Sequence, residues 1–162
     1  TQRLNNKDFD DYNTVMYGHN MNNGTGFHDL HKFRDPEFFN ENRFIYIYTP
    51  DEILIYKTFG AYIFTNAHIL YTYDFSDEDG FQSYLYLINS YPADNYDHSI
   101  EPTTDDRILT LSTCTNSEST RLLVQAKLMY RAACPYGESG EVPELIFSEE
   151  GLPKEDTSII RK

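Results

Sequence analysis

The middle of the chain carries short apolar runs with a period of two, which is typical of β-strands. Phenylalanine or tyrosine alternates with isoleucine over residues 44–48, after Arg43, and residues 49–52 (Thr-Pro-Asp-Glu) form a turn signal. A second apolar run covers residues 53–65 and is interrupted near Gly60. Two such runs joined by a short turn predict an antiparallel hairpin.

Four further segments predict strands. A short buried strand is expected at residues 13–17 and another at 68–73. The last two strands are predicted at residues 107–113 and 121–130, and the polar loop 115–120 between them is short enough to join antiparallel neighbours.

Helical spacing replaces the period of two in three places. The first helix follows the turn residues 22–26, with Thr25 as its candidate cap, and Asp35 before a proline begins a second, shorter helix. Ser76, followed by three acids, is expected to cap a third helix over residues 77–90. The residues expected to face the core are Phe27, Leu30 and Phe33 in the first helix and Phe81, Tyr84, Leu85 and Ile88 in the third.

These elements favour a mainly β fold in a single domain. The chain has 162 residues, among them 14 tyrosines and 11 phenylalanines, which suit strands better than a helical bundle. Strands and helices do not alternate as in parallel sheets, so we predict a mostly antiparallel β-barrel with helical insertions. An acidic loop is expected at residues 92–106. Residues 1–130 form the predicted domain, and residues 131–162 a C-terminal tail or appended element.

Charge and cysteine content narrow the functional classes. The net charge of −13 opposes binding to nucleic acid or to anionic membranes, and it suits either a cationic partner or plain solubility. The two cysteines, Cys114 and Cys134, are predicted to be free thiols, because a chain of this size needs no disulfide. His28, His31, His68 and His98 are scattered, so we expect solvated or core histidines, with no metal site and no cofactor.

Three residues carry the strongest chemical signal. Cys114 lies where an apolar strand meets a polar loop, a position that presents a nucleophile on a rigid element. His19 also stands at a strand end, next to Gly18, which permits close approach of another segment. Arg121 opens the strand after Cys114, so an antiparallel pairing brings its guanidinium near the thiol, where it can stabilise an oxyanion.

The surrounding motifs resemble those of a known family. Residues 110–114 read Thr-Leu-Ser-Thr-Cys, which matches the Thr-Leu-x-Thr-Cys signature of sortases, the transpeptidases of Gram-positive cell surfaces. Residues 17–21 (Tyr-Gly-His-Asn-Met) are similar to the histidine segment of that family, and Arg121 stands where its arginine follows the cysteine. The motif spacing and the helix inserted at 77–90 resemble class B sortases. The resemblance covers about residues 13–130.

The resemblance implies a sortase-type β-barrel and a thioester acyl-enzyme that an amine of peptidoglycan or of a pilin resolves. Carried over by position, Cys114 is the nucleophile, His19 the general acid/base, and Arg121 the stabiliser of substrate and oxyanion. Their neighbours Ser112, Thr113 and Thr115 are the expected substrate-binding residues. The implied donor is a sorting-signal peptide, of an Asn-Pro-x-Thr type, and the implied location is the extracellular face of the membrane, with an anchor upstream of residue 1.

Two alternatives and one departure from the family pattern remain. A thiol hydrolase would release the acyl group to water, and a non-catalytic interaction domain would keep the fold alone. Sortases carry a helix and several strands before the histidine segment, and these N-terminal strands are missing from the 162 residues. We therefore predict a barrel that residues 1–162 do not close, with an unpaired sheet edge.

Overall fold

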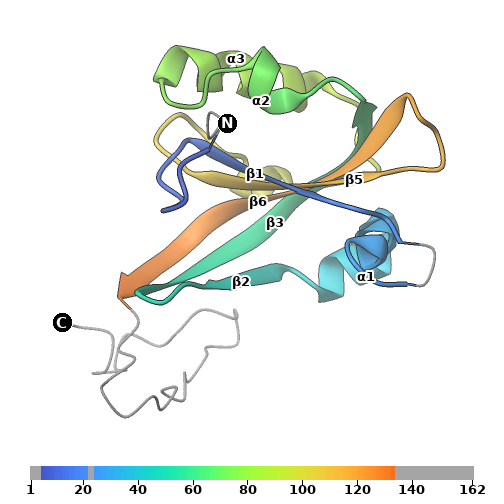
Figure 1. Cartoon of the computed structure of the whole chain (residues 1–162), viewed down its shortest axis with the longest axis horizontal. Coiled ribbons are helices and arrows are strands. Elements are labelled where there is room, and N and C mark those ends of the chain that lie inside the picture. The colour runs from blue at the N-terminus through green and yellow to red at the C-terminus, as the bar shows by residue number, and fades with distance from the viewer. Residues whose placement is uncertain (1–4, 22–23, 134–162) are drawn as a thin grey trace, which may run out of the picture.

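A computed structural model describes residues 5–21 and 24–133, and its centre is one twisted sheet (Figure 1). Cys134 and the predicted tail therefore lie outside the described residues. In chain order the elements are β1 (Asn13–Gly18), η1 (His28–Arg34), α1 (Pro36–Glu41), β2 (Phe44–Tyr48), β3 (Glu52–Thr65), α2 (Ile69–Thr72), α3 (Glu78–Ser90), β4 (Asn95–Tyr96), η2 (His98–Ile100), β5 (Ile108–Cys114) and β6 (Thr120–Ala133).

The strands pair in the order β1-β5-β6-β3-β2, with the short β4 also on β3. The predicted hairpin of β2 and β3 and the antiparallel pair β5–β6 are both confirmed. The pair β1–β5 is parallel, an exception to the expected antiparallel pattern. Among the described strands, β1 pairs only with β5 and β2 only with β3, so the sheet is a curled half-barrel with two edges. The mainly β class and the unclosed sheet are as predicted.

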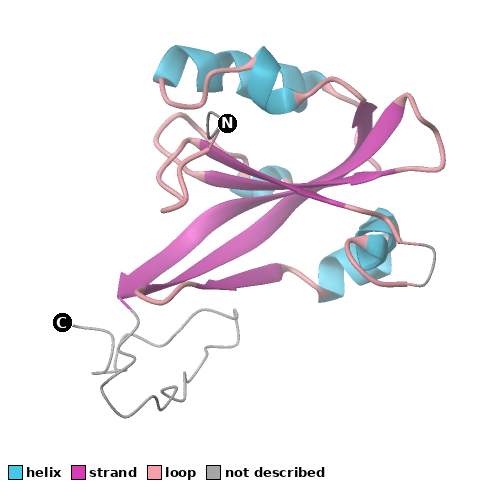
Figure 2. Cartoon of the chain, viewed as in Figure 1, coloured by secondary structure: helices cyan, strands magenta, loops and turns pink. Residues whose placement is uncertain are grey.

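Helices cover both faces of this sheet, as Figure 2 shows. Because side chains alternate along a strand, neighbouring residues of β6 belong to opposite faces. Leu123 packs into the large cluster that contains the buried side of α3, whereas Leu122 and Val124 pack with Leu30 and Phe33 of η1. The sheet thus has an α3 face and an η1 face, and the site described below is built at its end.

The helix α3 forms with the predicted apolar face. The four buried residues of this helix are Phe81, Tyr84, Leu85 and Ile88. The prediction of Ser76 as the cap is wrong: Asp77 is the cap, and its Oδ1 accepts a hydrogen bond from the Gly80 N–H at 2.8 Å. The Ser76 hydroxyl instead donates to the Asp74 carboxylate at 2.6 Å. This local hydrogen bond to a residue two positions earlier uses the serine side chain, so it does not cap the helix.

The segment before η1 also differs from the prediction. This helix is a 3-10 helix that begins at His28 and has no side-chain cap. Gly26, at φ 70°, turns the chain between Thr25 and the helix, so Thr25 stands too far upstream to cap it. In the next helix Asp35 accepts from the Phe38 N–H at 3.0 Å, which confirms Asp35 as the cap of α1.

Residues 68–73 do not form the predicted strand, and 92–106 is not all loop. The first segment is the short helix α2, in which Ile69 is buried in the main core cluster and the Tyr73 N–H donates to the Ile69 carbonyl. Its aromatic composition favours a strand only where a partner strand is available. The second segment contributes β4 and η2, since Gly60 and Ala61 of β3 pair with residues 95–96.

A buried polar network ties α3 to four strands of the sheet. Tyr62 donates to the Oε1 atom of Gln125, whose Nε2 donates to Tyr84 and to Thr110, both at 2.8 Å. Thr110 in turn donates to Asn13 at 2.8 Å. Burial raises the pKa of both tyrosines, so they remain neutral phenols. These bonds fix β1, β5 and β6 relative to one another, four residues along β5 and β6 from Cys114 and Arg121.

Candidate functional site

The three predicted catalytic residues form a row along the neighbouring ends of β1, β5 and β6. Cys114 pairs with Arg121 across β5 and β6, and Gly18 pairs with Thr113 across β1 and β5. The pairing of β1 with β5 ends there, and His19 and Cys114 are the next residues along the two strands. The cysteine and the arginine, as a cross-strand pair, project from the same face of the sheet. The order of the row is therefore His19, Cys114 and Arg121.

The guanidinium of Arg121 is held in a fixed orientation against the thiol. Its Nη1 lies 3.6 Å from Cys114 Sγ, and its Nε donates to Ser112 Oγ at 2.7 Å. Its Nη2 is 3.4 Å from the Ser112 carbonyl, and its Cζ lies 5.1 Å from the centre of the Tyr17 ring. Ser112 and Tyr17 are paired residues of β5 and β1, so the sheet itself positions the cation.

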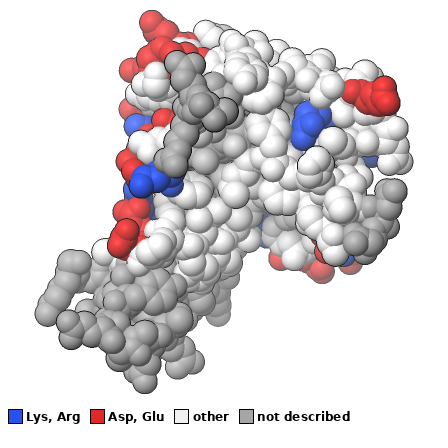
Figure 3. Space-filling view, viewed as in Figure 1, with Lys and Arg blue, Asp and Glu red and all other residues white. Residues whose placement is uncertain are grey.

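The charge of Arg121 remains available to a ligand. Within residues 5–21 and 24–133, no carboxylate forms an ion pair with this guanidinium. Figure 3 shows that many of the acidic side chains gather toward the margins of the face in view and leave much of its middle uncharged. The guanidinium of Arg121, beside the exposed thiol, would therefore stabilise a ligand that places an anionic or polarised oxygen atom there.

The backbone of His19 is fixed by the loop that follows it. The Phe27 N–H donates to the His19 carbonyl at 2.9 Å, and Asn20 forms a bridge with Gly26. A Cβ at Gly18 would lie 2.3 Å from the Phe27 ring, so only glycine lets the aromatic ring pack against this strand end. His19 is exposed to solvent.

Tyr17 adds a phenol to the same face. Its hydroxyl lies 3.4 Å from His68 Nδ1, and its ring contacts the His68 ring at 4.8 Å. Burial raises the pKa of Tyr17, and this outweighs the opposing effect of Arg121, so Tyr17 is a neutral donor. The sequence signal for this residue was its place two positions before His19, on the same strand face, but the prediction did not assign it a role.

The three expected substrate-binding residues have different environments. Ser112 and Thr113 are each 0% exposed, so neither reaches solvent in this structure. Ser112 lies under Arg121, whereas Thr113 points to the opposite face, where its Oγ1 is buried without a hydrogen bond. The Thr115 hydroxyl bonds to Thr120 Oγ1 at 2.6 Å and closes the loop between β5 and β6.

Further features of the described residues concern thiols, metals and membranes. Cys114 is a free and exposed thiol. In the described part of the chain, no three His, Cys, Asp or Glu side chains cluster as metal ligands would. None of the helices in that part combines the length and the apolar character needed to cross a bilayer.

Comparison with known proteins places the chain in a family. The family model described as "Sortase domain" matches residues 5–129. Among curated proteins, the chain is similar to sortase B of Listeria monocytogenes, at 31% identity over 134 residues, and to sortase B of Staphylococcus aureus, at 30% over 121 residues. These matches cover 77% and 73% of the chain but 51% and 49% of the relatives, so the chain spans about half the length of the curated relatives it matches.

Solved structures give the same result in three dimensions. Sortase B of Clostridium perfringens superposes with a TM-score of 0.66 at 30% identity, covering 77% of this chain and 69% of that one. Sortase B from the type II pilus of Streptococcus pneumoniae superposes with a TM-score of 0.67 at 34% identity, covering 77% and 71%. Both the sequence and the half-barrel therefore match proteins of the same kind.

Proposed function

Because the chain belongs to the sortase family and is similar to class B members, we propose that it is a cysteine transpeptidase. Its donor substrate is a sorting-signal peptide of a surface protein. Its acceptor is an amine, either of a peptidoglycan precursor or of a pilin. The proposed location is the extracellular face of the cell membrane, where such peptides and amines are found together.

The proposal assigns one role to each residue of the row. Cys114 attacks the scissile carbonyl as a thiolate, because the thiol itself is a poor nucleophile. Arg121 stabilises the oxyanion that forms, aided by the backbone N–H of Thr115, the residue that follows the nucleophile. His19, as an imidazolium, gives its proton to the departing amine. The single observation that carries the proposal is the Nη1–Sγ contact of 3.6 Å between Arg121 and Cys114.

The proposed reaction has two steps, acylation of Cys114 and transfer of the acyl group to the acceptor amine. In the first, a bond forms between Cys114 Sγ and the peptide carbonyl carbon, the peptide C–N bond breaks, and the leaving nitrogen takes a proton from His19. In the second, the acceptor amine attacks the thioester carbonyl carbon, the C–S bond breaks, and His19 takes a proton from the attacking nitrogen. The product is an amide, and the thiolate is restored beside Arg121.

A competition between amine and water tests this function. The 162-residue chain is incubated with an Asn-Pro-x-Thr peptide, with and without an added amine such as triglycine, and the products are separated by mass. A transpeptidase gives the amide of triglycine in preference to the free acid. Free acid alone at every amine concentration would make the chain a thiol hydrolase. Absence of both products would leave it a non-catalytic domain of sortase fold.

A further inference from the structure

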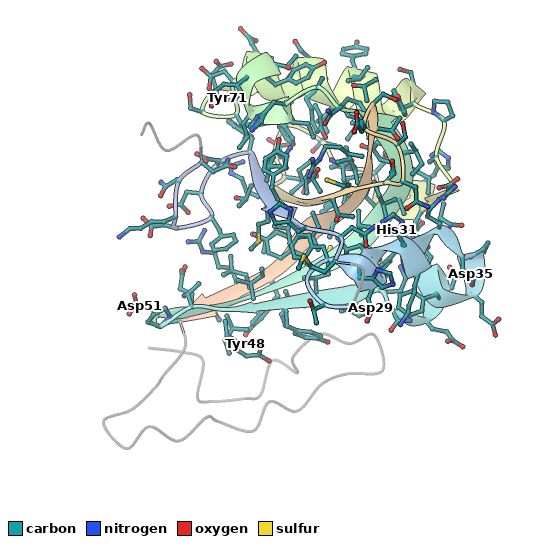
Figure 4. The ribbon with its side chains drawn as sticks, turned by 45° about the vertical axis from the view of Figure 1, so that its right-hand side comes forward. Asp29, His31, Asp35, Tyr48, Asp51 and Tyr71 are labelled. Atoms are coloured by element: carbon teal, nitrogen blue, oxygen red, sulfur yellow. The ribbon has the colours of Figure 1, made fainter. Side chains whose placement is uncertain are left out.

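A second histidine contacts the nucleophile from the other face of the sheet. His31 Nε2 lies 3.1 Å from the carbonyl oxygen of Cys114. A carbonyl can only accept, so the ring must donate a proton through Nε2, whatever its overall protonation state. In Figure 4, His31 lies with η1 on one side of the sheet, while Tyr71 on α2 lies on the other. The imidazole therefore reaches Cys114 from behind, away from the thiol.

The helix that carries His31 is firmly anchored to the sheet. Leu30 and Phe33, on either side of the histidine, pack against the cluster formed by Leu122 and Val124 of β6. The same helix follows directly on Phe27, whose N–H holds the His19 carbonyl. Residues 27–31 thus contact the backbone of the predicted acid/base through Phe27 and the backbone of the predicted nucleophile through His31.

The hydrogen bond acts on the peptide plane between Cys114 and Thr115. A peptide unit is planar, and in the trans form its C=O and N–H point in opposite directions. The structure has no cis peptide bonds among the described residues, so fixing the Cys114 carbonyl also fixes the direction of the Thr115 N–H. That N–H is the backbone donor in the proposed oxyanion site.

The side chains of the neighbouring loop do not hydrogen-bond to the Cys114 carbonyl. The hydroxyls of the loop after Cys114 are used within that loop, where Thr115 bonds to Thr120 and Ser117 to Ser119. Within the described residues, His31 supplies the side-chain hydrogen bond to this carbonyl. A hollow of about 270 Å³ opens between His31 and the loop, so a released peptide plane has room to rotate.

We propose that His31 is a positioning residue, which orients the Cys114–Thr115 peptide and thereby aims the Thr115 N–H at the oxyanion. The inference rests on the proposed function, but it adds a residue outside the row of His19, Cys114 and Arg121. It predicts an effect on the formation of the tetrahedral intermediate, with no effect on the reactivity of the thiol toward reagents that form no oxyanion.

The test uses variants matched in size. His31→Gln keeps an N–H donor at similar reach, whereas His31→Met has a similar length and no such donor. Acylation by the Asn-Pro-x-Thr peptide is expected to lose about 10-fold or more in kcat in His31→Met, with KM nearly unchanged, because part of an oxyanion donor's contribution is lost. His31→Gln is expected to restore most of the rate. Lys32→Ala, on the exposed side of the same helix, controls for changes in η1.

A second readout separates positioning from a general disturbance. Alkylation of Cys114 by iodoacetamide passes through no oxyanion, so its rate is expected to be equal in wild type, His31→Gln and His31→Met. Slower alkylation in His31→Met would show that the histidine acts on the thiol itself and would overturn the inference. Equal acylation in all variants would also overturn it, while leaving the proposed function intact. No acylation by the wild type would remove both.

Discussion

Arg121 and Cys114 form a cross-strand pair in which the guanidinium Nη1 lies 3.6 Å from the thiol sulfur. The same guanidinium is held by Ser112, through the side-chain oxygen and the carbonyl oxygen. Two of its three nitrogens are thus bound to one neighbour, and the third is left for the reacting atoms. A fixed donor costs no reorganisation when charge develops, which is the condition for strong oxyanion stabilisation.

This arrangement predicts that lysine cannot replace Arg121. Arg121→Lys keeps the charge but loses the planar fork that spans Ser112 and Cys114. The rate of acylation is expected to fall about 100-fold or more, at unchanged thermal stability. Arg34→Lys serves as the control, since Arg34 forms a surface ion pair with Asp94. Near-normal turnover in Arg121→Lys would reduce the arginine to a source of positive potential.

The close contact between Gly18 and Phe27 predicts a rescue experiment. Gly18→Ala places a methyl group 2.3 Å from the Phe27 ring and is expected to cost about 1–3 kcal/mol in stability and to lower activity through the neighbouring His19. Phe27→Ala removes the ring, so the double variant should lose less stability than the sum of the single variants. Thermal melts of the four proteins measure this coupling. Strict additivity would show that the two residues do not constrain one another.

The mechanism predicts a bell-shaped dependence of acylation on pH. The rate requires a thiolate at Cys114 and a proton on His19 at the same time, so it falls in acid and again in alkali. Initial rates of peptide cleavage measure the profile. A rate that rises with pH and never falls would exclude His19 as the acid.

Asp97 predicts how the fold responds to acid. Burial alone would raise the pKa of Asp97, but hydrogen bonds from Ser99 and from Arg43, the latter at 2.5 Å, outweigh it and lower the pKa to about 2. A carboxyl whose pKa is lowered by folding stabilises the folded state fully at pH values above its ordinary pKa, which is near 3.8. This stabilisation is lost as the pH falls to about 2, the pKa in the folded state. Asp97→Asn should therefore lower the Tm at neutral pH and reduce its further drop in acid. Parallel Tm curves for the two proteins would contradict this.

Much of the sheet could be predicted from the sequence, because its strands carry a clear apolar period. The strands expected at 13–17, 44–48, 53–65, 107–113 and 121–130 all form, and so does the expected apolar face of α3. Local rules failed where two signals compete. At residues 68–73 an aromatic strand pattern gave way to a helix that buries Ile69, and at the start of α3 Asp77 replaced Ser76 as the cap.

For the site, the sequence supplied the residues and the structure supplied their relationships. Cys114, His19 and Arg121 stood out through their motifs, and the strand register brings them into one row. The parallel pairing of β1 with β5 could not be predicted, because nothing local to either strand encodes it. His31 was read as one of several scattered histidines, since its contact with Cys114 joins positions 83 residues apart.

The thioester on Cys114 is the feature on which the whole account depends. Intact-protein mass spectrometry of the 162-residue chain with an Asn-Pro-x-Thr peptide measures it directly. A thioester mechanism predicts a mass increase equal to the acyl fragment, located at Cys114 and released by hydroxylamine. The adduct should be absent in Cys114→Ala and present in Cys134→Ala. An adduct that survives in Cys114→Ala, or that disappears in Cys134→Ala alone, would contradict the account.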